Sequence, residues 1–286
     1  MIFKRLANSV PLTATRLDYA RFRMTHRSPA PGATAAADKL IGEVAANGYA
    51  IVEDYWPREK CEACIADFER LMSENPEYVQ RYSDTRIFGI EALSALIDEF
   101  HSDSFLQDVC NRYAGGPMVN AFTLANKVEA HGGSKGSGEG WHKDSSFQQF
   151  KAFLYLNDIG EDQGPLQLLE RSHTLGAYLE DMRAAGLPFR QLRITDVQIE
   201  RILARGRERI KTMTGKAGTL IVADTASIHR GKPPVAGVRY ALTNYYMEAE
   251  QITEPYVEAY KPVSPAKVLA LRAAVPGAAE ARRHAA

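Results

Sequence analysis

Length, composition and charge are those of an ordinary globular protein. The 286 residues suffice for one sizeable core or two small ones, and 45% hydrophobic with 24% charged residues is a usual balance. Lys and Arg number 35, as do Asp and Glu, so the net charge is zero and favours neither nucleic acid nor an anionic membrane as a partner. No apolar run approaches the roughly 20 residues of a membrane span, and residues 1–24 lack the pattern of a secretory signal.

The first part of the chain is predicted to be mainly helical. Residues 1–33 have an irregular pattern that ends in a Pro- and Gly-rich stretch. Apolar spacing then predicts, in chain order, a helix over 35–46, a strand over 49–54, an amphipathic helix over 57–74, and shorter helices near 89–99 and 104–113.

The cysteines indicate a reducing, cytoplasmic compartment. Cys61, Cys64 and Cys110 cannot all pair, so a disulfide framework is not expected. Cys61 and Cys64 have the spacing of half a zinc site, but they lie inside a helical pattern and the sequence has no second pair. We therefore expect two buried thiols on a helix rather than a metal site.

Beyond residue 115 the pattern changes to short strands, predicted over 119–129, 150–156, 166–169, 218–224 and 238–248. Gly, Pro and Asp turns separate them, and helices do not alternate with them regularly, which favours an antiparallel sandwich or barrel.

These patterns together predict one α+β domain over 34–261, without internal repeats. Helical support over 34–115 would precede a β core over 117–249. A polar, Arg-rich insertion over about 175–215, with a helical part near 196–205, would cover the mouth of the barrel, where loops often carry function. The tail from 262 to 286 is expected to be peripheral.

His142-Lys143-Asp144, followed at a distance by His229, has the composition of a metal site. Residues i and i+2 of a strand point to the same face, so we expect His142 and Asp144 to converge while Lys143 points away. Two imidazoles and one carboxylate suit non-haem Fe(II) and leave positions open for a co-substrate and O₂. Such a tripeptide alone arises by chance, and a lone histidine is more often an ordinary polar residue. Their combination in this order favours a metal centre.

Arg239, ten residues after His229, offers a planar fork of donors to a carboxylate. A salt bridge at the rim is the ordinary alternative. A positive charge that enters a β core needs a partner, however, and a bound dicarboxylate would supply one. The metal motif and this arginine together indicate an oxygenase that consumes a 2-oxo acid.

At these residues the sequence resembles the phytanoyl-CoA dioxygenase family of Fe(II)/2-oxoglutarate-dependent oxygenases. The resemblance runs from about Asn120 to Glu248. Its landmarks are Trp141-His142-Lys143-Asp144, Gly164-Pro165-Leu166-Gln167-Leu168-Leu169, Arg171-Ser172-His173, Gly218-Thr219-Leu220, His229 and Arg239. The Gly-Pro-Leu…Ser-His stretch is the most specific of these, because it has no obvious role in binding a metal.

The resemblance implies a double-stranded β-helix (jelly-roll) core with the N-terminal helices packed on one sheet. It implies iron held by His142, Asp144 and His229, and 2-oxoglutarate held through its far carboxylate by Arg239. Lys127 matches a lysine that some members place near the co-substrate, and Phe153 matches an aromatic residue of the same pocket.

Two positions depart from the family pattern. Gly231 stands where many members have a Ser or Thr, which puts a hydrogen bond to the co-substrate in doubt. The spacing of ten from His229 to Arg239, where eleven is common, suggests a shortened turn. Asp144 itself is retained, which argues against a halogenase.

The expected reaction is hydroxylation of an unactivated C–H bond of a small molecule. Desaturation, cyclisation or epimerisation with the same cofactors is an alternative, because the outcome depends on the pose of the substrate. A catalytically silent binding module is a third possibility, although such a module needs neither the triad nor the arginine.

The substrate is poorly encoded. Tyr155 and Gln167 lie on strands that should line the cavity and are candidate contacts. A basic rim would select an anionic substrate; its candidates are Lys143, Lys151, Arg183, Arg190, Arg193, Arg201 and Arg205. A solvated charged face, balanced by nearby carboxylates, explains the same residues equally well.

Overall fold

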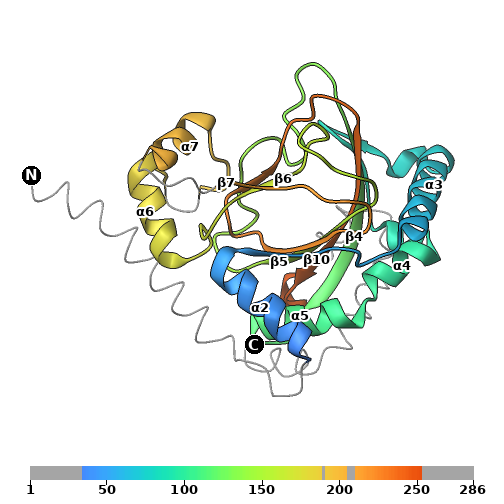
Figure 1. The fold of residues 1–286 in the computed structure, drawn as a ribbon, viewed down its shortest axis with the longest axis horizontal. Helices are drawn as coiled ribbons and strands as arrows, with labels where there is room; N and C mark the ends of the chain where they lie inside the picture. Colours follow the sequence, from blue (N-terminus) through green and yellow to red (C-terminus); the bar gives the residue numbers. More distant parts are fainter. Residues whose placement is uncertain (1–33, 189–190, 205–209, 253–286) are drawn as a thin grey trace, which may run out of the picture.

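Two antiparallel sheets form the centre of the protein (Figure 1). The computed structural model describes residues 34–188, 191–204 and 210–252. The larger sheet has the order β1 (Tyr49–Val52), β8 (Leu220–Asp224), β5 (Phe150–Tyr155), β10 (Val238–Met247), β4 (Val119–Glu129), β3 (Thr85–Phe88), β2 (Gln80–Arg81). The smaller has the order β7 (Ile210–Met213), β6 (Leu166–Leu169), β9 (His229–Gly231). This α+β arrangement around an antiparallel double sheet is the one expected from the sequence.

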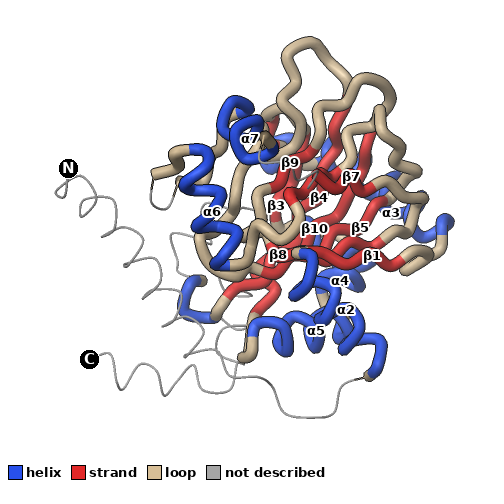
Figure 2. The backbone as a smooth tube through the Cα atoms, turned by 60° about the vertical axis from the view of Figure 1, so that its left-hand side comes forward, coloured by secondary structure: helices blue, strands red, loops and turns tan. Residues whose placement is uncertain are grey.

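Four helices cover the outer face of the larger sheet: α2 (Ala35–Asn47), α3 (Arg58–Glu74), α4 (Ala95–His101) and α5 (Ser104–Ala114) (Figures 1 and 2). Side chains at their N-termini cap three of them. Thr34 accepts from the amide of Ala37, and Asp103 accepts from two amides of the first turn of α5. Short 3₁₀ turns lie at η1 (Pro76–Tyr78), η2 (Ile90–Ala92) and η3 (Ala249–Gln251).

The main hydrophobic core lies between these helices and the outward face of the sheet. From α3 the expected stripe of Cys61, Cys64, Phe68 and Leu71 is buried. The three cysteines are free thiols, and burial raises the pKa of Cys61 to about 11. The predicted C-x-x-C pair therefore packs in the core, as expected.

Strand alternation gives the larger sheet two chemically different faces. Along β5, Phe150, Ala152 and Leu154 belong to the outer core, whereas Lys151 and Phe153 line an inner cavity. A site placed between the two sheets is therefore separated from the helical core by one layer of backbone.

The insertion between β6 and β7 contains two helices, α6 (Leu175–Ala185) and α7 (Asp196–Leu203). They lie at the opposite end of the molecule from α3 (Figures 1 and 2). They pack on each other and on Trp141 and Ile228, and so form a second hydrophobic cluster. Backbone pairing also anchors the insertion, since the amide of Lys143 donates to the Leu192 carbonyl at 2.8 Å and Ile194 donates to Trp141 at 3.0 Å.

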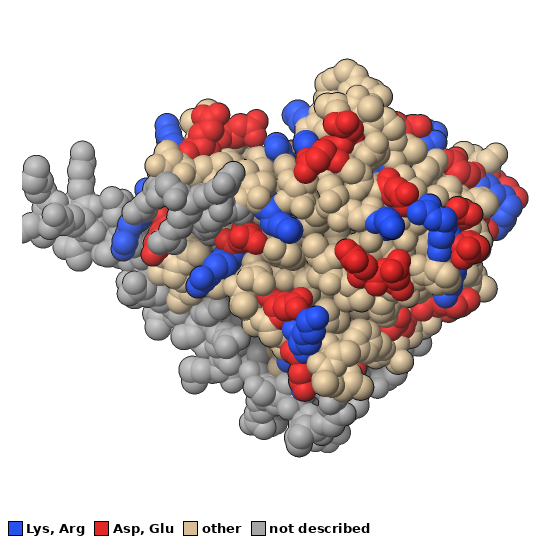
Figure 3. All heavy atoms as spheres, viewed as in Figure 1, with Lys and Arg blue, Asp and Glu red and all other residues tan. Residues whose placement is uncertain are grey.

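Several elements differ from the sequence-based expectations. Strands β2, β3, β7 and β9 and helix α6 were not anticipated, and the helix expected over 89–99 is a 3₁₀ turn followed by α4. The irregular segment over 1–33 and the tail over 262–286 lie outside the described residues. No helix of the described ranges combines the length and apolar character needed to cross a bilayer. On the face drawn in Figure 3, acidic and basic side chains are interspersed.

Candidate metal centre

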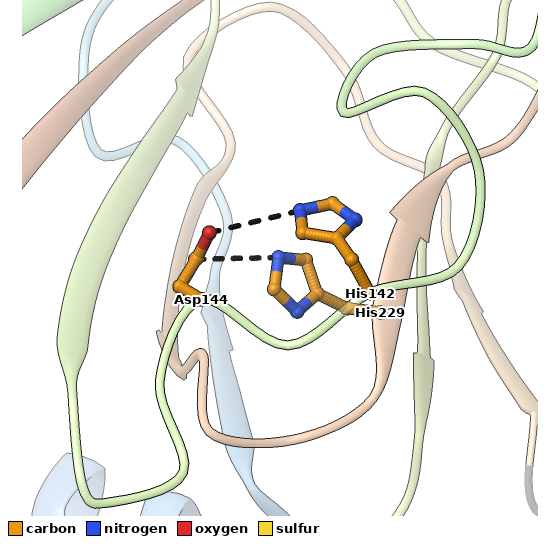
Figure 4. A group of neighbouring side chains, drawn as sticks. All are labelled: His142, Asp144 and His229. Atoms are coloured by element: carbon orange, nitrogen blue, oxygen red, sulfur yellow. Dashed lines mark ion pairs between the residues drawn. The ribbon is translucent and has the colours of Figure 1, made fainter. Parts of the chain in front are cut away.

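His142, Asp144 and His229 meet between the two sheets (Figure 4). One donor atom from each lies within 4.8 Å of the others. His142 Nε2 is 3.7 Å from Asp144 Oδ1, and His229 Nε2 is 3.4 Å from Asp144 Oδ2. If each donor atom lies about 2.1 Å from a bound metal ion, neighbouring donor atoms lie about 3 Å from one another. Small side-chain movements would therefore complete the site.

Backbone hydrogen bonds between separate segments bring the three residues together. His142 and His229 exchange reciprocal N–H···O bonds of 2.9 and 2.8 Å, and the amide of Asp144 donates to the Thr225 carbonyl at 3.0 Å. The sequence pattern predicted that His142 and Asp144 occupy positions i and i+2 of one strand. In the structure no strand continues from His142 to Asp144. The segment turns after a single bridge to His229, and this turn directs Asp144 toward both imidazoles.

Both imidazoles have the tautomer that metal binding requires. His142 Nδ1 lies 2.9 Å from the Gly140 carbonyl, and His229 Nδ1 lies 2.9 Å from the Ser227 carbonyl. A carbonyl accepts only, so each Nδ1 carries the proton and each Nε2 offers a lone pair to the metal. Burial, followed by the neighbouring His229, lowers the pKa of His142 to about 3, so this ring is neutral at physiological pH.

Asp144 is held as a carboxylate. Burial alone would raise its pKa, but Lys151 and the two histidines outweigh burial and hold the pKa well below its ordinary value. Lys151 Nζ lies 2.8 Å from Asp144 Oδ2. The charged form that binds a metal is therefore already present in the folded protein.

Glycine at two positions allows backbone segments to approach the site. Gly138 has φ +83°, and a Cβ there would lie 2.2 Å from His142 Cε1. A Cβ on Gly231 would lie 2.9 Å from the Ser137 Cβ. The glycine-rich loop thus occupies the space that a Ser or Thr at 231 would need, which explains this departure from the family pattern.

A cavity of about 300 Å³ adjoins the three residues. Its floor is the inner face of the larger sheet. Directly opposite residues of neighbouring strands point to the same face, so their side chains lie next to one another along this floor. Among the lining residues are Arg86, Phe88, Leu124, Asn126, Ser137, Gly138, Lys151, Phe153, Tyr155, Leu166, Arg193, Gly231, Arg239, Ala241, Thr243 and Tyr245.

Arg239 lies in the wall of this cavity and is only 5% exposed. One guanidinium nitrogen, Nη1, donates to the Gly164 carbonyl, while Nε has no hydrogen-bond partner among the described residues. Burial lowers the pKa of Arg239, although the group remains far from neutral at physiological pH. A buried guanidinium in a cavity wall, with one donor left unpartnered among the described residues, suits a carboxylate ligand.

Of the other predicted site residues, Phe153 and Tyr155 line the cavity and Lys127 and Gln167 do not. Lys127 is a correction, because strand alternation turns it to the outer face of β4. There it pairs with Glu69 at 3.0 Å and with Glu129 at 3.2 Å. Gln167 points away from the cavity as well, and its amide bonds to Thr212 and Arg230.

Of the candidate basic rim, Lys151 and Arg193 reach the cavity. Lys143 is 3% exposed and lies 4.0 Å from the Tyr178 ring centre, in the insertion cluster. Arg183 and Arg201 are exposed on the outside of the insertion. Arg190 and Arg205 lie outside the described residues.

Sequence reasoning missed a polar group beside Arg239. Asp84 is buried and accepts from Arg86 Nε at 2.8 Å, from Asn126 Nδ2 at 2.9 Å and from Ser137 Oγ at 3.0 Å. Arg86 enters the cavity through β3, a strand too short to give a clear pattern. Asn126 could have been found, because it alternates with Lys127 and must face the other side of β4.

The antiparallel double sheet, the two histidines with one aspartate, and the buried arginine define the class of iron- and 2-oxoglutarate-dependent dioxygenases. A model of the family described as Phytanoyl-CoA dioxygenase (PhyH) matches residues 44–235. The chain belongs to this family, which confirms the resemblance noted in the sequence.

Individual relatives are distant. The ectoine dioxygenase of Bordetella bronchiseptica is 24% identical over 204 residues, which cover 64% of this chain and 66% of that protein. The match thus spans slightly less than two thirds of the relative's length.

Two solved structures show the same fold at low identity. EctD from S. alaskensis with bound Fe has a TM-score of 0.60 at 18% identity, covering 79% of this chain and 82% of that chain. The epimerase SnoN in complex with Fe3+, alpha ketoglutarate and nogalamycin RO has a TM-score of 0.58 at 16% identity, covering 75% and 84%. At these identities the likeness establishes the jelly-roll fold.

Proposed function

We propose that this protein is an active Fe(II)/2-oxoglutarate-dependent dioxygenase that hydroxylates a C–H bond of a small molecule. The observation that carries the proposal is one cavity with three metal donors and a buried arginine whose Nε has no partner in the described part of the chain. His142, Asp144 and His229 would hold the iron. Arg239 would bind the far carboxylate of 2-oxoglutarate, and Phe153 would pack against its chain.

The bound iron would couple the conversion of 2-oxoglutarate and O₂ to succinate and CO₂ with oxidation of the substrate. The protein's own residues provide position and shielding. Backbone carbonyls orient the two imidazoles, and Lys151 holds the carboxylate. Arg239 is only 5% exposed, so water would have little access to the co-substrate end of the cavity. The reaction requires no general base.

Charge balance supports a substrate with a negative group. The two charges of the metal and that of Arg239 would be matched by the two carboxylates of 2-oxoglutarate and by Asp144. Arg86 is matched by Asp84. Among the cavity-lining residues this leaves the positive charges of Lys151 and Arg193.

Of these two cations, Arg193 is the better candidate for the substrate. Lys151 is held by Asp144, whereas the Arg193 guanidinium donates to the Gly138 carbonyl and pairs with no carboxylate among the described residues. Arg193 is exposed and lines the cavity beside His142, so it stands at the mouth. We therefore propose an anionic substrate whose charged group binds Arg193 while the reacting carbon reaches the metal.

The test of substrate class compares an acid with its amide. Arg193→Gln should raise the KM for a carboxylic acid roughly tenfold, as expected for loss of one charge-assisted contact, and should leave the amide unaffected. Arg201→Gln is the matched control, because Arg201 is exposed on the same insertion and does not line the cavity. Equal effects on acid and amide would contradict the proposed role of Arg193.

The test of activity is succinate formation from 2-oxoglutarate with Fe(II) and a panel of small acids. We expect substrate-dependent succinate in the wild type and none in Asp144→Ala. Product mass then separates the outcomes: a gain of one oxygen for hydroxylation, loss of two hydrogens for desaturation or cyclisation, and no change for epimerisation. A protein that binds neither iron nor 2-oxoglutarate would instead be a silent jelly-roll binding module.

We also propose a cytoplasmic location. Three free cysteines in the described core support it, because unpaired thiols persist in reducing compartments. Oxidised cysteines in protein isolated from the producing cells would contradict this location.

A further inference from the structure

Lys151 is a buried cation directly beside a metal ligand. Its side chain is 5% exposed, and Nζ lies 2.8 Å from Asp144 Oδ2. Tyr245, the opposite residue on β10, places its ring centre 3.7 Å from the same nitrogen. The ammonium is thus fixed between the carboxylate and an aromatic face.

Burying the Lys151 ammonium beside a metal site costs free energy, which suggests that the lysine has a function there. A buried ammonium is unfavourable without a partner, and a positive charge near a divalent metal opposes metal binding by Coulomb repulsion. The 2.8 Å contact between Nζ and Asp144 Oδ2 is the geometry of an ammonium paired with a carboxylate.

The contact restricts how Asp144 can bind a metal. A carboxylate can bind through one oxygen or through both, and two-oxygen binding would occupy a position that the co-substrate or O₂ needs. Both oxygens of Asp144 face the histidine donors: Oδ1 lies 3.7 Å from His142 Nε2, and Oδ2 lies 3.4 Å from His229 Nε2. Lys151 Nζ contacts only Oδ2, at 2.8 Å. An oxygen that is paired with an ammonium is a poorer metal donor, since its negative charge is shared.

We propose that Lys151 is a positioning residue that limits Asp144 to one-oxygen ligation, and that it thereby keeps the coordination positions for 2-oxoglutarate and O₂ open. This inference rests on the proposed function, because it concerns the same metal centre. Tyr245 holds Lys151 in place through the cation–π contact and by covering the apolar part of its chain.

The experiment uses the full chain loaded with Co(II), whose visible absorption reports coordination number without any turnover. Lys151→Met keeps the length of the side chain and removes its charge. We expect a changed Co(II) spectrum and an affinity for 2-oxoglutarate that is weaker by roughly tenfold. The affinity for Co(II) itself should be no weaker, because a repulsive charge has been removed. Lys151→Arg should restore both properties.

Lys127→Met is the matched control. It makes the same chemical change in the same sheet, but on the outer face, where the lysine pairs with Glu69 and Glu129. The Co(II) spectrum and the 2-oxoglutarate affinity should both stay at wild-type values. Should Lys151→Met fail to fold, Lys151→Gln repeats the test, since its amide is too short to reach Asp144 and the same spectral change is expected.

Other outcomes separate the rival roles of Lys151. An unchanged spectrum with unchanged 2-oxoglutarate affinity would overturn the inference. A rise in the KM for substrate alone would make Lys151 a substrate contact instead, and would overturn it as well. A wild-type protein that binds neither Co(II) nor 2-oxoglutarate would refute the proposed function, an outcome that Lys151 variants are not needed to detect.

Discussion

Arg239 is deeply buried in the cavity wall, and its Nε has no hydrogen-bond partner within residues 34–188, 191–204 and 210–252. Arg239→Ala should raise the concentration of 2-oxoglutarate required for half-maximal succinate formation. The loss of a bidentate charged pair is worth about 1.5–3 kcal/mol, or roughly 10- to 150-fold. Metal affinity, measured by titration with Co(II), should change far less, because Arg239 contributes no donor to the metal. An unchanged 2-oxoglutarate requirement would mean that another residue holds the carboxylate.

Gly231 departs from the family pattern because the Ser137 backbone lies close to it. Replacing it with the Ser that many members carry should destabilise this protein, because a Cβ would lie 2.9 Å from the backbone nitrogen of Ser137 as well as from its Cβ. Overpacking of this kind costs about 1–3 kcal/mol. Urea unfolding of Gly231→Ser against Gly132→Ser isolates the clash at 231, because neither glycine has positive φ and a Cβ on the exposed Gly132 would meet nothing within 4 Å.

At the scale of elements, the insertion helices support the metal site through the backbone. Trp141 and Ile228, the residues directly before the two ligand histidines, pack in the cluster formed by α6 and α7. Residues 192–194 pair with the His142 segment. The insertion is therefore a fixed wall of the site, which makes its packing relevant to metal binding.

Ile199 tests this coupling. It is 4% exposed on α7, and Ile199→Ala should cost about 2–4 kcal/mol in packing and cavity terms. We expect faster amide exchange over residues 192–194 and weaker Co(II) binding. Val197→Ala, on the same helix and 55% exposed, should change neither. Unaltered metal binding in Ile199→Ala would show that the ligand segment does not depend on the insertion.

Long elements with a clear period could be predicted from the sequence, and short ones could not. Strand β4 has the predicted bounds, and the buried stripe of α3 is the predicted one. Strands such as β3 and β9 have too few residues to show alternation, and tertiary pairing alone defines them. Within the site, residue type and order predicted that His142, Asp144 and His229 would lie together, and the structure brings them to one cavity with Arg239. Lys127 lies on the outer face of β4 instead, because strand alternation places it opposite to Asn126.

At the scale of the whole molecule, ligands that bind only the folded state should stabilise it. With metal and 2-oxoglutarate each at about a hundredfold excess over its Kd, each ligand contributes about 2.7 kcal/mol. For a chain of this size each contribution corresponds to a rise in Tm of roughly 5–10 °C. Removal of metal by a chelator should reverse the rise. The same rise in Asp144→Ala would place the binding elsewhere.

Acid should destabilise the metal-free protein. His142 has a folded-state pKa of about 3, lowered mainly by burial, against an ordinary value of 6.5. Between these two values the unfolded chain binds a proton that the folded protein does not, so the free energy of unfolding falls as pH falls from about 6.5 to 3. Above this window His142 contributes no pH dependence. Urea unfolding across the window, with His142→Gln as the comparison, measures its share of the slope.

The pairing of β4 with β10 has a consequence for how this lineage can change in length. The register runs unbroken from Glu129 to Phe122 and shifts by one residue only at Tyr245 and Tyr246. A single insertion or deletion within that run would exchange the orientations of Asn126 and Lys127, sending an ammonium into the pocket and an amide toward Glu69. An insertion or deletion of two residues, or of one residue at the existing bulge, would leave the cavity-facing side chains of β4 in place. Homologous sequences should therefore differ here by even numbers.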